Sequence, residues 1–98
     1  MSVAPSATVL RGFAFSPAAL AVLESLPPKL RGQVTRKARA LQLDPHPRGS
    51  IKLKGEFTGD GEQIYRERSG DYRIFYVVRA SPSEVVVVKV RNRKDSYR

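Results

Sequence analysis

Arginine residues flank a short predicted turn at residues 69–71, Ser-Gly-Asp. Side chains alternate between the faces of a strand, so Arg66 and Arg68 share one face. If the last two residues of the segment form a two-residue turn, Arg68 lies opposite Arg73 on the next strand, and Arg66 lies opposite Phe75. Like charges opposite each other across a sheet are unfavourable, and a phosphate held by both guanidinium groups would remove that cost. The pattern indicates a phosphate-binding surface; the alternative is a solvated face with splayed arginines.

A second group of cations surrounds a tyrosine near the end of the sequence. It comprises Arg91, Arg93, Lys94 and Arg98 around Tyr97. A phenol ring among cations can stack on a base while the cations hold phosphates. The alternative is a basic chain end with a packed tyrosine. Lys52 and Lys54 alternate along a short predicted strand and are further phosphate-binding candidates.

The charge balance favours a polyanionic partner. Lys and Arg total 18 against 9 Asp and Glu, which gives a net charge of +9. Such an excess attracts nucleic acid first and acidic protein second, and it says nothing about fold. A basic domain without a polyanion partner is the alternative.

Several kinds of site are excluded by residue type. Without cysteine there is no disulfide framework, thiolate zinc site or cysteine nucleophile. The single histidine, His46, lies in a proline-rich loop and cannot complete a catalytic triad or a histidine metal site. We find no glycine-rich phosphate loop, signal peptide or membrane-spanning stretch. We therefore expect no metal or cofactor, and a cytoplasmic protein.

The spacing of apolar residues predicts one α+β domain. Residues 1–8 are expected to be a loose leader and residues 9–98 the domain, since 98 residues suffice for one. A predicted strand precedes two helices separated by a double proline, and four predicted strands follow. The four consecutive valines of the last strand predict a central strand buried on both faces. The predicted strands span residues 9–15, 51–56, 62–68, 72–79 and 84–91, and the helices residues 17–26 and 28–43.

Three blocks of the sequence, residues 51–55, 64–76 and 88–98, resemble the RelE/ParE toxin superfamily. Residues 70–74 and 93–97 are the most specific parts, and the resemblance covers nearly everything after residue 8. It implies a mostly antiparallel sheet of four to five strands with an N-terminal helix hairpin on one face. It also implies a toxin of a type II toxin–antitoxin system, neutralised by a cognate antitoxin.

The resemblance implies one of two activities. RelE-like members cleave mRNA in the ribosomal A site without a metal, through attack of the RNA 2′-OH; ParE-like members inhibit DNA gyrase. The catalytic positions of the RelE-like members fall on Arg66, Arg68, Arg73, Arg93 and Tyr97. All five carry suitable chemistry, which favours an endoribonuclease over a gyrase inhibitor. One departure is that family members often have lysines where this chain has Arg66 and Arg68, and arginine cannot act as a general base. A plain RNA-binding module remains a third hypothesis.

Overall fold

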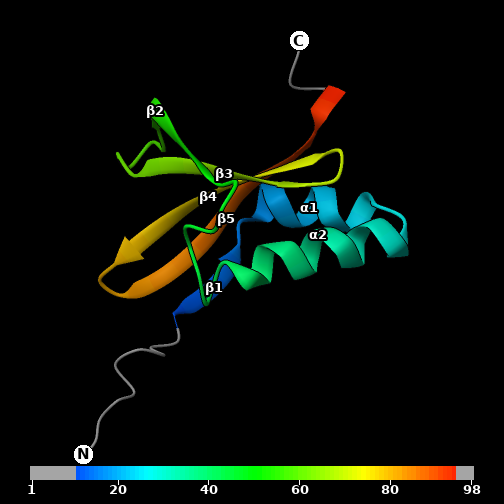
Figure 1. Cartoon of the computed structure of the whole chain (residues 1–98), viewed down its shortest axis with the longest axis horizontal. Helices are drawn as coiled ribbons and strands as arrows, with labels where there is room; N and C mark the ends of the chain where they lie inside the picture. The colour runs from blue at the N-terminus through cyan, green and yellow to red at the C-terminus, as the bar shows by residue number, and fades with distance from the viewer. Residues whose placement is uncertain (1–10, 95–98) are drawn as a thin grey trace, which may run out of the picture.

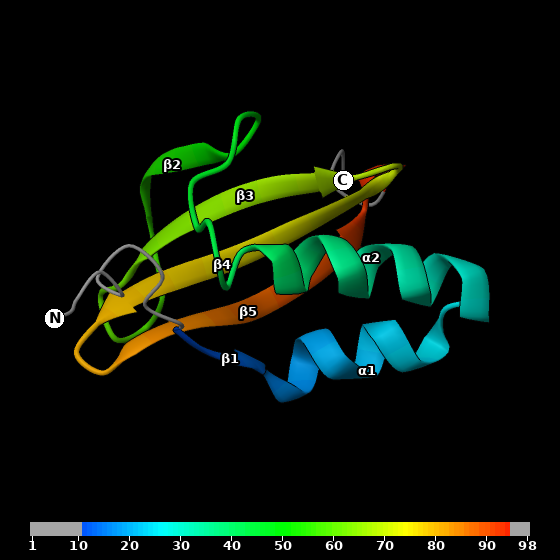
Figure 2. The same cartoon turned by 60° about the horizontal axis from the view of Figure 1, so that its bottom comes forward.

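The computed structural model describes residues 11–94, which form a five-stranded sheet and two helices (Figure 1). The order across the sheet is β1-β5-β4-β3-β2, with β1 parallel to β5 and the other neighbours antiparallel. Both helices lie against one face of the sheet (Figure 2). The predicted α+β architecture is thus confirmed. In chain order the elements are β1 (Gly12–Phe15), α1 (Pro17–Ser25), α2 (Pro28–Ala40), β2 (Ile51–Phe57), β3 (Gln63–Ser69), β4 (Tyr72–Ala80) and β5 (Ser83–Asn92).

Ser16 begins α1 and ties that helix to the sheet. Its hydroxyl oxygen accepts a hydrogen bond from the backbone N–H of Ala19 at 3.1 Å, which satisfies a donor that the first turn leaves unpaired. The same hydroxyl donates to the backbone oxygen of Val88 on β5 at 2.9 Å. Helix α1 is therefore held against β5 from its first turn.

The second helix ends earlier than the sequence predicted. Helix α2 stops at Ala40, whereas the apolar spacing predicted helix to residue 43. The backbone N–H groups of Leu41, Gln42 and Leu43 each donate to the carbonyl three residues earlier. The chain therefore continues after the α-helix in narrower turns with 3₁₀-type hydrogen bonds. Pro45 follows, and the residue before a proline disfavours helical geometry.

The core lies between the helices and one face of the sheet. Helix α1 contributes Ala19 and Leu23 to it, and the end of α1 adds Leu26. Tyr76 of β4 is fully buried, and its hydroxyl donates to the backbone oxygen of Pro45 at 2.6 Å. The remaining buried members are Val34, Ala38, Leu41, Ile74, Val85, Val87 and Val90.

The prediction for the valine strand was right about its interior place in the sheet and wrong about its burial. β5 lies between β1 and β4 and pairs with both. Val85 and Val87 are fully buried, but Val86 and Val88 are partly exposed. The physical reason is that both helices cover the same face, so Val86 and Val88 on the strand's remaining positions receive no burial from the helices.

The other predicted strands agree with the structure to within one residue at each end. The first predicted strand, residues 9–15, is seen as β1, with residues 9 and 10 outside the described range. Among residues 11–94 no helix is long and apolar enough to cross a membrane.

Candidate functional site

Three arginines form a row across three neighbouring strands. Ser69 pairs with Tyr72, so the β3–β4 connection is a two-residue turn in which Gly70 has a φ of 58°. Arg68 therefore lies opposite Arg73, as the sequence predicted. Arg73 also lies opposite Arg91 of β5. We call Arg68, Arg73 and Arg91 the arginine row; it spans two strand spacings, about 10 Å.

A second row runs beside the first, one step further from the turn. Arg66 of β3 lies opposite Phe75 of β4, as predicted, and Phe75 lies opposite Lys89 of β5. The Lys89 ammonium is 5.4 Å from the centre of the Phe75 ring. Since these residues alternate with the helix-side positions Ile74 and Tyr76, both rows lie on the sheet face away from the helices. We call the arginine row together with Arg66, Phe75 and Lys89 the cationic face.

A bulge in β5 places two of these cations on the cationic face. Tyr76 pairs with Val87 but Phe75 pairs with Lys89, so Val88 is an extra residue in the strand. Without the extra residue, the pairing of Tyr76 with Val87 would continue residue by residue along both strands. Arg91 would then lie opposite Tyr72, on the helix side of the sheet. Sequence reasoning missed Lys89, although its alternation with Arg91 on one strand was a usable signal.

The cations of this face influence one another electrostatically. Burial lowers the pKa of the Arg66 guanidinium below its ordinary value, and the charges of Arg73 and then Arg68 lower it further. Glu56 acts in the opposite direction. Positive charges gathered this closely favour a bound anion, and a phosphate matches the forked geometry of guanidinium groups.

The opposite end of the same sheet face is neutralised. Arg79 of β4 forms ion pairs with Glu62 at 2.6 Å and with Glu84 at 2.8 Å. The hydrogen bond from Arg79 holds the pKa of Glu62 below its ordinary value of 4.5. Attraction for a polyanion is therefore concentrated at the end of the sheet next to the β3–β4 turn.

The chain leaves β5 beside that turn. The backbone N–H of Arg93 donates to the backbone oxygen of Asp71 at 2.6 Å, and the backbone N–H of Lys94 donates to the Asn92 side chain at 2.9 Å. Arg93 and Lys94 are exposed at the end of the cationic face. The candidates Tyr97 and Arg98 lie outside the described residues.

The two lysines of β2 are placed differently from the arginines. Lys52 lies opposite Tyr65, whose ring stacks on the buried Tyr76 ring with 5.7 Å between centres, so Lys52 belongs to the helix side. Lys54 falls where the β2–β3 register is irregular, and it is exposed. A shift of one residue in register moves a side chain to the other face. Phosphate binding by either lysine stays a prediction.

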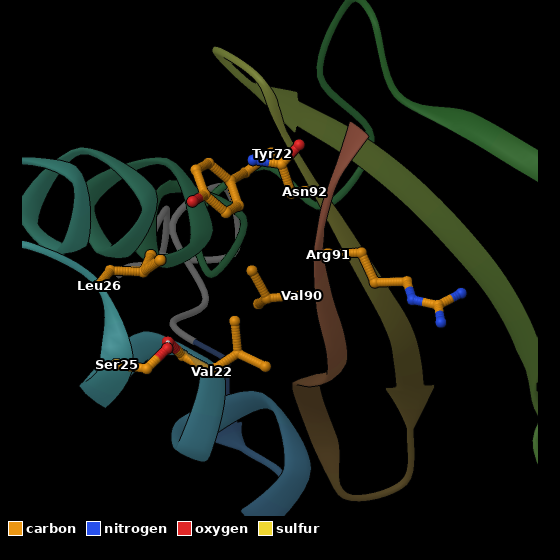
Figure 3. Close-up of a pocket in the computed structure, with 7 residues that line it drawn as sticks. All are labelled: Val22, Ser25, Leu26, Tyr72, Val90, Arg91 and Asn92. Atoms are coloured by element: carbon orange, nitrogen blue, oxygen red, sulfur yellow. The ribbon is translucent and has the colours of Figure 1, made fainter. Parts of the chain in front are cut away.

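A groove lies behind the arginine row, between the end of α1 and the ends of β4 and β5. Its volume is about 620 Å³, and Val22, Leu26, Tyr72 and Val90 are among the residues that line it. Figure 3 shows the Arg91 guanidinium on the far side of the β5 ribbon from Val22 and Leu26. The charge of Arg91 therefore belongs to the cationic face and not to the groove.

A metal centre has no candidate in the described part of the chain. Among residues 11–94 no group of three or more His, Cys, Asp or Glu side chains could hold a metal ion. His46 is exposed and meets the Tyr65 ring edge-on, with 4.8 Å between ring centres, on the helix side of the sheet. The chemistry available at the cationic face is that of arginine and lysine.

Comparison with known proteins identifies the family. The model of the ParE toxin of the type II toxin–antitoxin system, parDE, matches residues 13–97. The chain belongs to this toxin family. No curated protein matches the sequence of this toxin.

Solved structures similar to this toxin come from RelE proteins. The archaeal RelE–RelB complex from Pyrococcus horikoshii OT3 contains a chain 30% identical, with a TM-score of 0.71, covering 87% of this chain and 97% of that chain. The RelBE2 toxin–antitoxin complex from Mycobacterium tuberculosis gives 28% identity and a TM-score of 0.71, covering 87% and 93%. The intact E. coli RelBE toxin–antitoxin complex gives 25% identity and a TM-score of 0.66, covering 84% and 95%. Family and fold together place this toxin in the RelE/ParE superfamily.

Proposed function

We propose that this toxin is a ribosome-dependent endoribonuclease that cleaves mRNA in the cytoplasm. The observation that carries the proposal is the arginine row, in which Arg68, Arg73 and Arg91 are direct cross-strand partners on one sheet face. A surface selected for stability alone would not align three like charges. A bound RNA phosphate removes the repulsion, and the same guanidinium groups can stabilise charge that develops on that phosphate.

The reaction proposed for this face needs no metal. The 2′-oxygen of a nucleotide attacks the adjacent phosphorus, loses its proton, and forms a 2′,3′-cyclic phosphate as the bond to the 5′-oxygen breaks. That 5′-oxygen leaves as a hydroxyl once it gains a proton. Arg66, Arg68 and Arg73 would stabilise the phosphate oxygens, Arg93 would face the leaving oxygen, and Tyr97 would stack on a base.

Proton removal from the 2′-OH is not assigned to a side chain. A guanidinium group cannot act as an effective general base, so neither Arg66 nor Arg68 is given this role. We infer that the toxin acts mainly by positioning the RNA and stabilising charge, while the ribosome aligns the mRNA. This makes the intact ribosome, and not free RNA, the relevant substrate.

We also propose that an antitoxin protein neutralises this toxin. The similar structures from M. tuberculosis, P. horikoshii and E. coli are toxin–antitoxin complexes. A partner with acidic and apolar segments would complement the net charge of +9, by covering the cationic face or by displacing the segment that contains Tyr97. Co-purification of a neighbouring gene product would support this. Recovery of the toxin alone, stable and harmless to its host, would contradict it.

A gyrase inhibitor is the second candidate function. The matching family description names ParE, and the resemblance links ParE-like members to DNA gyrase. In that function the cationic face would hold no RNA phosphate during inhibition. Substitutions in the arginine row would then leave mRNA unaffected.

Induced expression followed by mapping of mRNA 5′ ends on ribosomes separates the two candidates. Cuts within reading frames, absent with Arg73→Ala and retained with Arg79→Ala, would support the endoribonuclease. Arg79 is the matched control because it lies on the same strand at the other end of the sheet face, where Glu62 and Glu84 neutralise its charge. DNA damage without mRNA cuts would instead support the gyrase inhibitor.

A further inference from the structure

Phe75 is an aromatic residue in the middle of a positively charged surface. Its cross-strand partners are Arg66 on one side and Lys89 on the other, and Arg73 precedes it by two residues on the same face. The ring is partly exposed. Phe75 does not belong to the helix-side core, nor to the partly buried residues packed against that core. The packing of the helices therefore does not explain an aromatic ring at this position.

The position of the ring relative to the arginine row suits one nucleotide. Arg73 and Phe75 are two residues apart on one strand, about 7 Å. Arg91 lies opposite Arg73 and therefore diagonal to Phe75. A phosphate held between Arg73 and Arg91 would leave the base of the same nucleotide within reach of the Phe75 ring.

We propose that Phe75 is a stacking platform for an unpaired RNA base whose phosphate is held by the arginine row. An aromatic ring accepts any base, because every base has a π face, so the platform gives affinity without strong sequence preference. A base in a duplex is already stacked on its neighbours, so the platform selects single-stranded RNA. The inference deepens the proposed function, since it concerns the RNA held at the same site.

Lys89 does not block this role. Its ammonium is 5.4 Å from the ring centre, and its side chain is exposed. An exposed cation–π contact is weak and a lysine side chain is flexible, so an arriving base can displace the ammonium. Lys89 would then meet the phosphate of the neighbouring nucleotide, one strand away from Arg73.

Two short oligomers of equal charge, each with the same fluorescein label, test the proposal. One is a 2′-O-methyl RNA hexamer, which has no free 2′-OH and cannot be cleaved by the proposed reaction. The other is a hexamer of abasic sugar phosphates. Phe75→Leu should weaken binding of the RNA hexamer by about 5- to 100-fold, the range expected for one stacked base, and leave the abasic hexamer unchanged. Phe75→Tyr should keep the parent affinity for both.

Phe57→Leu is the matched control. Phe57 is 55% exposed on the edge strand β2, away from the arginine row, so the same change there should leave both affinities unchanged. Arg91→Ala should weaken both oligomers, because it removes a phosphate contact. If Phe75→Leu weakens both oligomers equally, or weakens neither, the stacking proposal is overturned.

A tryptophan probe gives a second measurement that does not depend on the leucine variant folding. The chain contains no tryptophan, so Phe75→Trp places a single fluorophore at the proposed platform. Stacking of a base should quench its emission with an unlabelled RNA hexamer and not with an unlabelled abasic hexamer. Quenching that does not depend on the bases would overturn the proposal.

The two proposals fail in different ways. Base-dependent quenching at position 75 without any mRNA cleavage in cells would keep the stacking platform and reject the endoribonuclease. Cleavage in cells, with Phe75→Leu equal to the parent on both oligomers, would keep the endoribonuclease and reject the platform.

Discussion

Arg73 of β4 and Arg91 of β5 are direct cross-strand partners, and Arg68 completes their row from β3. The three residues come from separate segments of the chain, and the sheet brings their charges onto one face. At the other end of that face, Arg79 is neutralised by Glu62 and Glu84. Arg79, whose charge is already paired, can therefore serve as the control for substitutions in the arginine row.

Arg73 is the central member of the row, and its removal should abolish mRNA cleavage without unfolding the protein. Arg73→Ala relieves like-charge repulsion, so the free energy of unfolding should change by less than about 1 kcal/mol. Arg73→Lys should restore part of the cleavage, because the charge returns without the forked geometry. Thermal unfolding and 5′-end mapping measure the two effects. If Arg73→Ala unfolds the protein, Arg73 is structural and the phosphate interpretation fails.

Arg91 and Arg79 should differ in how they affect the salt dependence of RNA binding. Each phosphate contact with single-stranded RNA contributes about 0.7 to the slope of log affinity against log salt. Arg91→Ala should reduce that slope by about 0.7. Arg79→Ala should leave it unchanged, because two carboxylates already neutralise Arg79. Titration of the uncleavable RNA hexamer at several salt concentrations measures the slopes, and equal slopes for both variants would contradict the assignment of Arg91.

Tyr97 distinguishes the two toxin activities. If it stacks on a nucleotide, Tyr97→Ala should lower mRNA cleavage by roughly tenfold to a hundredfold, since one stacked base is worth about 1–3 kcal/mol. Tyr97→Phe should keep most of the activity. Loss of activity in both variants would point to proton transfer by the hydroxyl. Cleavage at the parent rate in Tyr97→Ala would remove Tyr97 from the site and weaken the RelE-like assignment.

Tyr76 should make the stability of the fold sensitive to alkaline pH. Burial raises the pKa of its phenol from 10.0 to about 12. Between these values the unfolded chain has released the proton while the folded chain still holds it. Stability is therefore present below pH 10 and falls as pH rises toward 12.

Tyr76→Phe tests that dependence. It should cost about 1–2 kcal/mol at neutral pH, because the Pro45 carbonyl loses its buried donor. It should also flatten the alkaline decline, since the variant has no phenol at this position to ionise. Urea unfolding of both proteins at a series of pH values measures this. An unchanged alkaline slope would show that Tyr76 does not titrate with unfolding.

The local features of this toxin could be predicted from its sequence because they depend on neighbouring residues. Ser16 and Pro17 mark the start of α1, and the double proline separates the helices. The register of the β3–β4 hairpin follows from its two-residue turn, and that register puts Arg68 opposite Arg73. These relationships span few residues, so turn chemistry and side-chain alternation suffice to fix them.

The composition of the cationic face was decided only in the tertiary structure. The extra residue Val88 shifts the β4–β5 pairing by one position, and this shift alone brings Lys89 and Arg91 to the face of Arg73. The opposite outcome occurred on β2, where pairing with Tyr65 places Lys52 on the helix side. Period-two alternation shows which residues of a strand share a face but not which face, because that choice depends on pairing with a distant strand.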